Sequence, residues 1–141
     1  MWVFSYDVNS SIFKKEDETF KKIEFEITTI FEILNSNVEN KLKFTLITIF
    51  KVLEILTGKY NLIGSEYDKN IKLFHNNGLR EYDKDIRQIV CTRNFLIHDG
   101  KIETLYYSCK KDFIERPTQD NILTWFKMLQ TILVKIDKVF I

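Results

Sequence analysis

The scarcity of turn-forming residues is the feature that most restricts the fold of this chain. Its 141 residues include only 4 Gly and 1 Pro. An antiparallel β protein needs frequent tight turns, and Gly and Pro supply most of them. Long segments instead carry apolar residues three and four positions apart, which indicates amphipathic helices. The sequence therefore predicts an all-α protein, with residues 1–141 forming a single domain because their number suits one domain.

The apolar spacing divides the chain into a bundle of roughly five helices. Their expected ranges are 11–35, 38–57, 66–76, 80–98 and a last helix that begins after Thr118 and carries apolar residues as far as Phe140. Residues 1–9 are expected to form an N-terminal arm or a brief strand, and residues 102–107 a short extended piece. The second helix is apolar around most of its circumference, so it is expected either to be central or to meet another subunit.

Local chemistry marks several helix ends. Gly58 is expected at the position just after the second helix, and Gly100 after the fourth. Ser65, with Asp68 three residues later, is expected to cap the third helix, and Thr118 the last.

Composition restricts the function classes. With 21 basic and 20 acidic side chains the formal net charge is +1, so the chain does not coat nucleic acid by bulk electrostatics and would need a local site to handle RNA. Hydrophobic residues make up 45% of the chain and include 12 Phe, which excludes disorder and suggests an apolar face covered by a second subunit.

Cysteine usage and the N-terminus suggest where the protein resides. Cys91 and Cys109 have no metal-like spacing and are interpreted as free thiols in a reducing compartment. Cys91 could act as a nucleophile, but an inert buried thiol is the simpler interpretation. The N-terminus lacks the features of a signal peptide, and the apolar region 44–56 is too short and too charged to cross a bilayer. We therefore expect a cytoplasmic protein without a membrane partner.

The fourth predicted helix places an arginine in an apolar arc. On a helical wheel, Arg93 lies in the middle of the arc formed by Ile86, Ile89, Val90, Leu96 and Ile97. Burying a guanidinium is costly unless it is paired or hydrogen-bonded. Arg93 should therefore have a partner, face a shared and hydrated interface, or extend its charged end to solvent.

The opposite side of the same helix is polar. Arg87, Cys91, Asn94 and His98 recur at helical spacing, and the Asn94 amide lies one turn from the His98 imidazole, where it can orient the ring. Arg93 and His98 are about 140° apart on the wheel, so either the reach of the arginine or a second copy of the helix must bring the two together. A histidine at this position could also serve only as a cation beside the helix dipole.

The segment Arg93–His98, RNFLIH, resembles the motif of the HEPN superfamily (higher eukaryotes and prokaryotes nucleotide-binding). That motif is an Arg, four to six further residues and a His, often with a polar residue directly after the Arg. It lies late on a helix of a small all-α bundle, as it does here on the fourth predicted helix before Gly100. The resemblance implies a HEPN-like bundle that forms a homodimer through the motif helix.

The resemblance also implies an activity, that of a metal-independent endoribonuclease acting as a toxin or an antiviral defence effector. Carried onto this chain, His98 would be the general base or acid for attack by a ribose 2′-OH. Arg93 would bind the scissile phosphate, and Asn94 would orient His98 or hold the phosphate. The products would be a 2′,3′-cyclic phosphate and a 5′-hydroxyl, with no cofactor or metal. Arg87 and Lys101 are candidate RNA contacts.

Other interpretations remain open at this point. The domain could be a catalytically inactive HEPN-like module that binds a partner protein or a nucleotide, or the motif could be coincidental. HEPN toxins controlled by nucleotidyltransferase antitoxins have a Tyr two residues after the His, and Gly100 at that position argues against this form of regulation while leaving room for another antitoxin or regulatory partner. His75 is interpreted as a solvated or capping residue. The basic side chains after the motif are explained equally well by RNA contact or by a solvated loop; these are Lys101, Lys110, Lys111 and Arg116.

Overall fold

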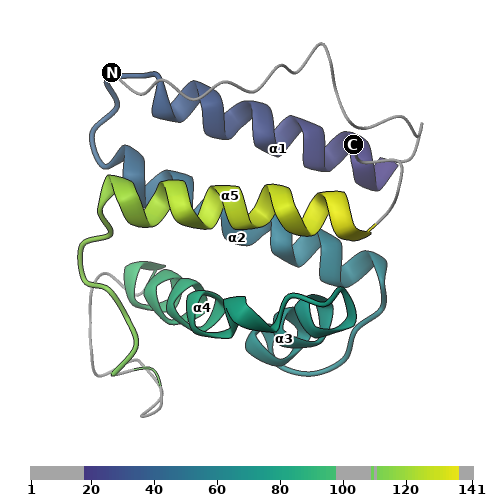
Figure 1. Ribbon diagram of the computed structural model, residues 1–141. Coiled ribbons are helices and arrows are strands. Elements are labelled where there is room, and N and C mark those ends of the chain that lie inside the picture. Colours follow the sequence, from purple (N-terminus) through teal and green to yellow (C-terminus); the bar gives the residue numbers. More distant parts are fainter. Residues whose placement is uncertain (1–17, 98–108, 110, 137–141) are drawn as a thin grey trace.

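The described part of the chain consists of helices and their connections. The computed structural model describes residues 18–97, 109 and 111–136. The elements are α1 (Glu18–Leu34), α2 (Lys41–Lys59), α3 (Glu66–Asn76), the short 3-10 helix η1 (Arg80–Tyr82), α4 (Asp83–Ile97) and α5 (Gln119–Ile136) (Figure 1). None of the described residues is in a strand, and each of the five expected helices has its counterpart, so the all-α prediction is confirmed.

Several expectations lie outside the described residues. They are the arm at 1–9, the first turns of the helix expected to begin at 11, the helix end at Gly100, the extended piece at 102–107 and the contribution of Phe140 to the last helix. Among the helices that are described, none combines the length and the apolar character needed to cross a bilayer.

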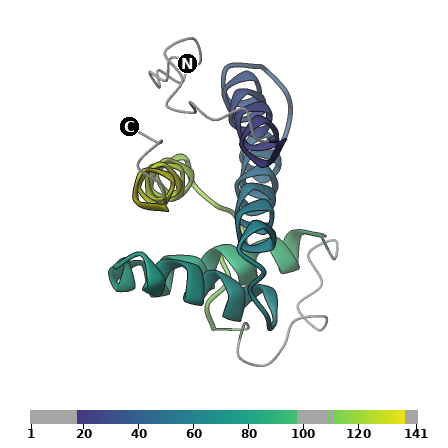
Figure 2. The same ribbon diagram turned by 90° about the vertical axis from the view of Figure 1, so that its right-hand side faces the viewer.

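α2 is the central helix of the bundle. α1, α3, α4 and α5 all pack against it. In Figure 2, α1 and α2 stand together as one column, α5 lies to one side of it, and α3 and α4 cross beneath. Side chains such as Leu46, Phe50 and Leu53 are at most 1% exposed. Most of the apolar surface of α2 is therefore used within one chain, as a helix contacted on several sides requires, although Phe44 is 44% exposed.

The ends of α3 follow from their sequence. The Ser65 hydroxyl oxygen accepts a hydrogen bond from the Asp68 N–H at 3.2 Å, which is the predicted N-cap. At the other end Gly78 adopts a φ of 72°, a left-handed conformation that favours glycine. The Leu79 N–H then donates to the Phe74 carbonyl at 2.9 Å, and the buried Leu79 side chain holds the turn against the core.

The predicted end of α2 at Gly58 is wrong by a few residues. The helix continues to Lys59, and the left-handed position belongs to Asn61, with a φ of 53°. The Leu62 N–H donates to the Thr57 carbonyl at 3.2 Å, the bond expected across such a helix end. Asparagine tolerates the left-handed conformation better than most residues, so the chain did not need the glycine for the stop.

α5 begins as expected and supplies aromatic core. The Thr118 hydroxyl oxygen accepts from the Asn121 N–H at 3.2 Å, and the Asn121 side-chain oxygen accepts from the Thr118 N–H at 2.9 Å. Trp125 and Phe126 are each 1% exposed. Phe126 meets Phe31 of α1 edge to face, with ring centroids 5.4 Å apart. The aromatic residues of this helix are therefore part of the core, as predicted.

Candidate functional site

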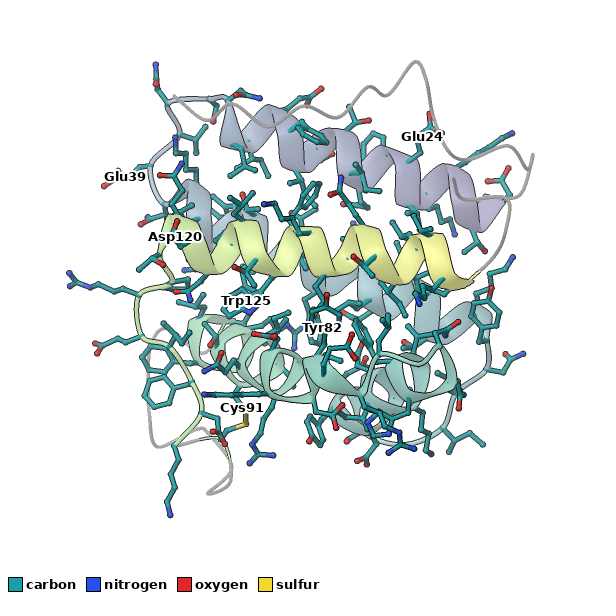
Figure 3. All side chains as sticks on the ribbon, in the orientation of Figure 1. Glu24, Glu39, Tyr82, Cys91, Asp120 and Trp125 are labelled. Carbon is teal, nitrogen blue, oxygen red and sulfur yellow. A yellow bond between two sulfur atoms is a disulfide. The ribbon has the colours of Figure 1, made fainter. Side chains whose placement is uncertain are left out.

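The two cysteines are joined in a disulfide, so the prediction of free thiols is wrong. Cys91 of α4 bonds to Cys109 of the following segment, with the Cα atoms 5.2 Å apart. The bond is seen beside Cys91, next to α4 in Figure 3. Both residues are buried, at 2% and 7% exposure. Sequence spacing could not reveal this pairing, because the pairing depends on the chain folding back along α4. Since the thiols are not free, they no longer indicate a reducing compartment.

Residues 111–114 continue this packing along α4. The Thr92 hydroxyl oxygen accepts a hydrogen bond from the Ile114 N–H at 2.9 Å. The rings of Phe95 and Phe113 pack with centroids 4.6 Å apart. α4 is therefore covered on two sides. The helical core covers one side, and residues 109 and 111–114, called the returning segment below, cover the other. This explains why Thr92 is fully buried and Phe95 is 4% exposed although both lie outside the apolar arc.

Arg87 holds the returning segment through a charge pair. Its Nε donates to the Asp112 carboxylate, and its guanidinium lies 5.5 Å from the centre of the Tyr67 ring on α3. The hydrogen bond to Asp112 raises the pKa of the Arg87 guanidinium above its usual value, against the opposing effect of burial. Arg87, expected to be a candidate RNA contact, thus has a structural role linking α4, α3 and the returning segment.

A cavity of about 330 Å³ lies beside this cluster. Its walls are formed by Ser65, Glu66, Tyr67, Arg87, Val90, Cys91, Asn94 and Cys109. The helical wheel placed Arg87, Cys91 and Asn94 on one face, and these three residues do line the same cavity. Its volume is at the lower end of the range that holds small molecules.

Arg93 lies on the other flank of α4, against α2. Its guanidinium carbon is 4.3 Å from the centre of the Phe50 ring, and Nη2 is 4.0 Å from a carboxylate oxygen of Glu54. The Arg93 side chain is 26% exposed and that of Glu54 is 43% exposed. An ion pair at this separation and exposure contributes little. The partner that the sequence required is therefore chiefly an aromatic face. The Arg93 Nε is buried and has no hydrogen-bond partner among the described residues.

Asn94 connects the two flanks. Its side-chain oxygen accepts a hydrogen bond from Arg93 Nη1 at 3.1 Å, while the residue also lines the cavity on the opposite side. The structure therefore brings Asn94 to Arg93, and the predicted pairing of Asn94 with His98 stays a prediction. His98 and Lys101 lie outside the described residues.

His75 has a partner that the sequence did not indicate. Its Nε2 lies 2.7 Å and 2.9 Å from the two carboxylate oxygens of Asp83. This pair connects the end of α3 to the start of α4, and the His75 side chain remains 24% exposed.

The surroundings of Arg93 were the part of the site that sequence reasoning missed. Phe50 and Glu54 lie one turn apart on α2, and their spacing shows only that they share a helical face. Nothing local indicates that this face turns toward Arg93. For Cys91 and Cys109 the one available signal was their number, since a chain with two cysteines can form a single disulfide.

Comparison with family models, with curated proteins and with solved structures gives no match. Within the described residues there is also no group of three or more His, Cys, Asp or Glu side chains placed to hold a metal ion. The function therefore has to be argued from the chemistry of α4 and its surroundings.

Proposed function

We propose that this protein is a metal-independent endoribonuclease of the HEPN type. It would cleave RNA by attack of a ribose 2′-OH, leaving a 2′,3′-cyclic phosphate and a 5′-hydroxyl. The observation that carries the proposal is the state of Arg93, a fixed and partly exposed cation whose carboxylate partner among the described residues, Glu54, lies 4.0 Å away and is 43% exposed.

The two arginines of α4 show why this state is informative. Arg87 is paired with Asp112, as expected of an arginine that holds a fold together. Arg93 is held instead by the face of Phe50 and by the Asn94 amide oxygen, neither of which neutralises its charge. A stacked guanidinium keeps its planar set of donors in one orientation, which suits bidentate binding of a phosphate.

The proposed reaction assigns one proton transfer to each histidine of a dimer. His98 takes the proton of the 2′-OH as the O2′–P bond forms. The P–O5′ bond breaks, and His98 of the partner subunit protonates the leaving 5′ oxygen. Arg93 binds the non-bridging phosphate oxygens and stabilises the charge that develops on them. Asn94 positions the Arg93 guanidinium.

The homodimer is part of this proposal and is expected to form through α4. One chain supplies a single motif, and the wheel separates Arg93 from His98, so two copies are needed to surround one phosphate. Ile97, at the end of α4, is 42% exposed. Covering that apolar side chain with a second subunit would be favourable.

We place the enzyme among toxins or antiviral defence effectors acting in the cytoplasm, held inactive by an antitoxin or another regulatory partner. In that compartment the Cys91–Cys109 bond has to persist against cellular reductants, and its burial would slow their access.

The test is cleavage of a labelled RNA by purified protein in excess EDTA. We expect cleavage to continue, with products ending in a cyclic phosphate and a 5′-hydroxyl. Arg93→Ala and His98→Ala should each lower the rate at least about a hundredfold, the usual effect of removing a group that acts in the transition state. Arg80→Ala, which removes an exposed arginine of η1, is the matched control and should cleave normally.

Three results would contradict the proposal. A requirement for a divalent ion would exclude the mechanism, and full activity of His98→Ala would exclude the site. A protein that is monomeric by sedimentation yet cleaves RNA would exclude the composite site.

A second candidate is supported by the cavity that Asn94 lines. With Tyr67 and Asn94 in its wall, the cavity of about 330 Å³ offers an aromatic ring and an amide to the base of a nucleotide. A catalytically inactive module of this kind would bind nucleotides, which calorimetry would detect, and would leave RNA intact.

A further inference from the structure

A second cavity, larger than the one beside Cys91, lies where α2 begins. Its volume is about 450 Å³. Leu42, Leu96 and Pro117 give it an apolar floor, and three cations border it: Lys41, Lys43 and Arg116. Glu115 is the one carboxylate in the lining. The cavity therefore combines an apolar interior with an excess of positive charge.

The three cations are not neutralised within the described part of the chain. None of them forms an ion pair with a carboxylate there. Lys41 donates to the Leu34 carbonyl at 3.5 Å, a partner without net charge. Cations gathered around a cavity repel one another, and an anion placed among them relieves that repulsion.

The cavity lies along the same faces of α2 and α4 as the contacts of Arg93. Lys43, Phe50 and Glu54 recur at the spacing of one face of α2, and Arg93 contacts the latter two. On α4, Leu96 of the cavity floor follows Arg93 by one turn. Phe50 follows Lys43 by seven positions in α2, which corresponds to a rise of about 10 Å along the helix axis. That length corresponds to about three stacked nucleotides at ~3.4 Å each.

We infer that this cavity is a binding subsite for single-stranded RNA, a few nucleotides from the phosphate held by Arg93. Lys41, Lys43 and Arg116 bind backbone phosphates, and the apolar floor receives a base. A run of acidic residues would satisfy the cations but leave the floor uncovered, whereas every nucleotide carries both an anionic phosphate and a flat base, so RNA fits better. The inference rests on the proposed ribonuclease function and adds to it the part of the site that binds substrate beside the cleaved bond.

The test measures binding of a fluorescent, 2′-O-methylated oligoribonucleotide, which lacks the nucleophile and is not cut. The Kd of the full-length protein is measured from about 0.05 to 0.3 M NaCl, a range over which screening changes strongly. The test variant carries Lys41→Gln, Lys43→Gln and Arg116→Gln. The control variant carries Lys22→Gln, Lys127→Gln and Lys135→Gln, which remove the same charge from exposed positions on α1 and α5.

We expect the Kd of the test variant at low salt to rise roughly tenfold or more. The slope of log Kd against log salt should fall by about 2, because each of the three lost phosphate contacts contributes about 0.7. The control should bind within about twofold of the unmodified protein. Circular dichroism of both variants checks that each is folded.

The outcomes separate the subsite from the enzyme. Equal weakening in both variants overturns the subsite, even if the protein cleaves RNA in EDTA. Selective weakening in the test variant supports the subsite, even if no cleavage is seen, in which case the proposed enzyme is what fails. Binding of labelled polyglutamate at these cations, with no binding of the oligoribonucleotide, overturns the inference in favour of an acidic protein partner.

Discussion

Arg93 illustrates how a single side chain can be fixed without being neutralised. The Phe50 ring and the Asn94 amide oxygen restrain the guanidinium. Its ion-pair partner, the carboxylate of Glu54, is 4.0 Å away, and the Glu54 side chain is 43% exposed. Water screens such a pair, so Glu54 reduces the attraction of Arg93 for an anion only slightly. The arrangement has the features expected of a group that receives a phosphate.

Removing the Glu54 charge should therefore strengthen RNA binding. In Glu54→Gln we expect the Kd for the 2′-O-methylated oligoribonucleotide to fall about two- to fivefold, the change that corresponds to an exposed ion pair. Glu32→Gln, an exposed position on α1 with the same change in charge, is the control. Equal tightening in the two variants would show that only net charge matters and that Glu54 does not act on Arg93.

At the scale of the element, two glycines at or near the ends of α2 and α3 have different roles. Gly58 lies inside α2, and a Cβ added there would meet nothing within 4 Å. Gly78 has equally open surroundings, but its φ of 72° is the left-handed conformation that ends α3. The difference between them is therefore one of backbone conformation and not of space.

These roles predict opposite effects of the same substitution. Gly58→Ala should raise the free energy of unfolding by up to about 1 kcal/mol, since alanine loses less backbone entropy in a helix. Gly78→Ala should lower it by about 1 kcal/mol, because a Cβ is disfavoured at that φ. Urea denaturation measures both. A destabilised Gly58→Ala would restore the view that Gly58 ends α2.

At the scale of the whole molecule, α4 is held between two parts of the same chain. The core lies on one side, and the returning segment lies on the other, joined by the disulfide, the Arg87–Asp112 pair and the Thr92–Ile114 hydrogen bond. The disulfide closes a loop with a sequence separation of 18 that includes the whole RNFLIH motif. The position of the motif is therefore tied to a bond that joins the residues on either side of it.

This bond should contribute measurably to stability. Reduction is expected to lower the free energy of unfolding by about 3 kcal/mol, the value for a closed loop of this length. Thiol titration of the denatured protein without reductant should detect no reactive cysteine. Cys91→Ala/Cys109→Ala should resemble the reduced protein. Two titratable thiols in freshly purified protein would contradict the pairing.

The sequence by itself determined the all-α class, the extent of α3 and the caps at Ser65 and Thr118. These features depend on residues within a turn or two of one another, where side-chain periodicity and hydrogen-bond geometry are local. It also determined that Arg93 would need a partner, because an apolar arc cannot hold an isolated charge. The stop at Gly58 failed since Asn61 offered an alternative end nearby.

Only the tertiary structure decided which partners the key residues have. Phe50 lies under Arg93, Asp112 pairs with Arg87, and Cys109 reaches Cys91. Each of these contacts joins segments far apart in sequence, so it depends on how α2, α4 and the returning segment pack, and periodicity within one helix carries no information about the facing element. The sequence shows that α4 carries two arginines. It does not show that Arg87 has a structural role while Arg93 remains available to bind an anion.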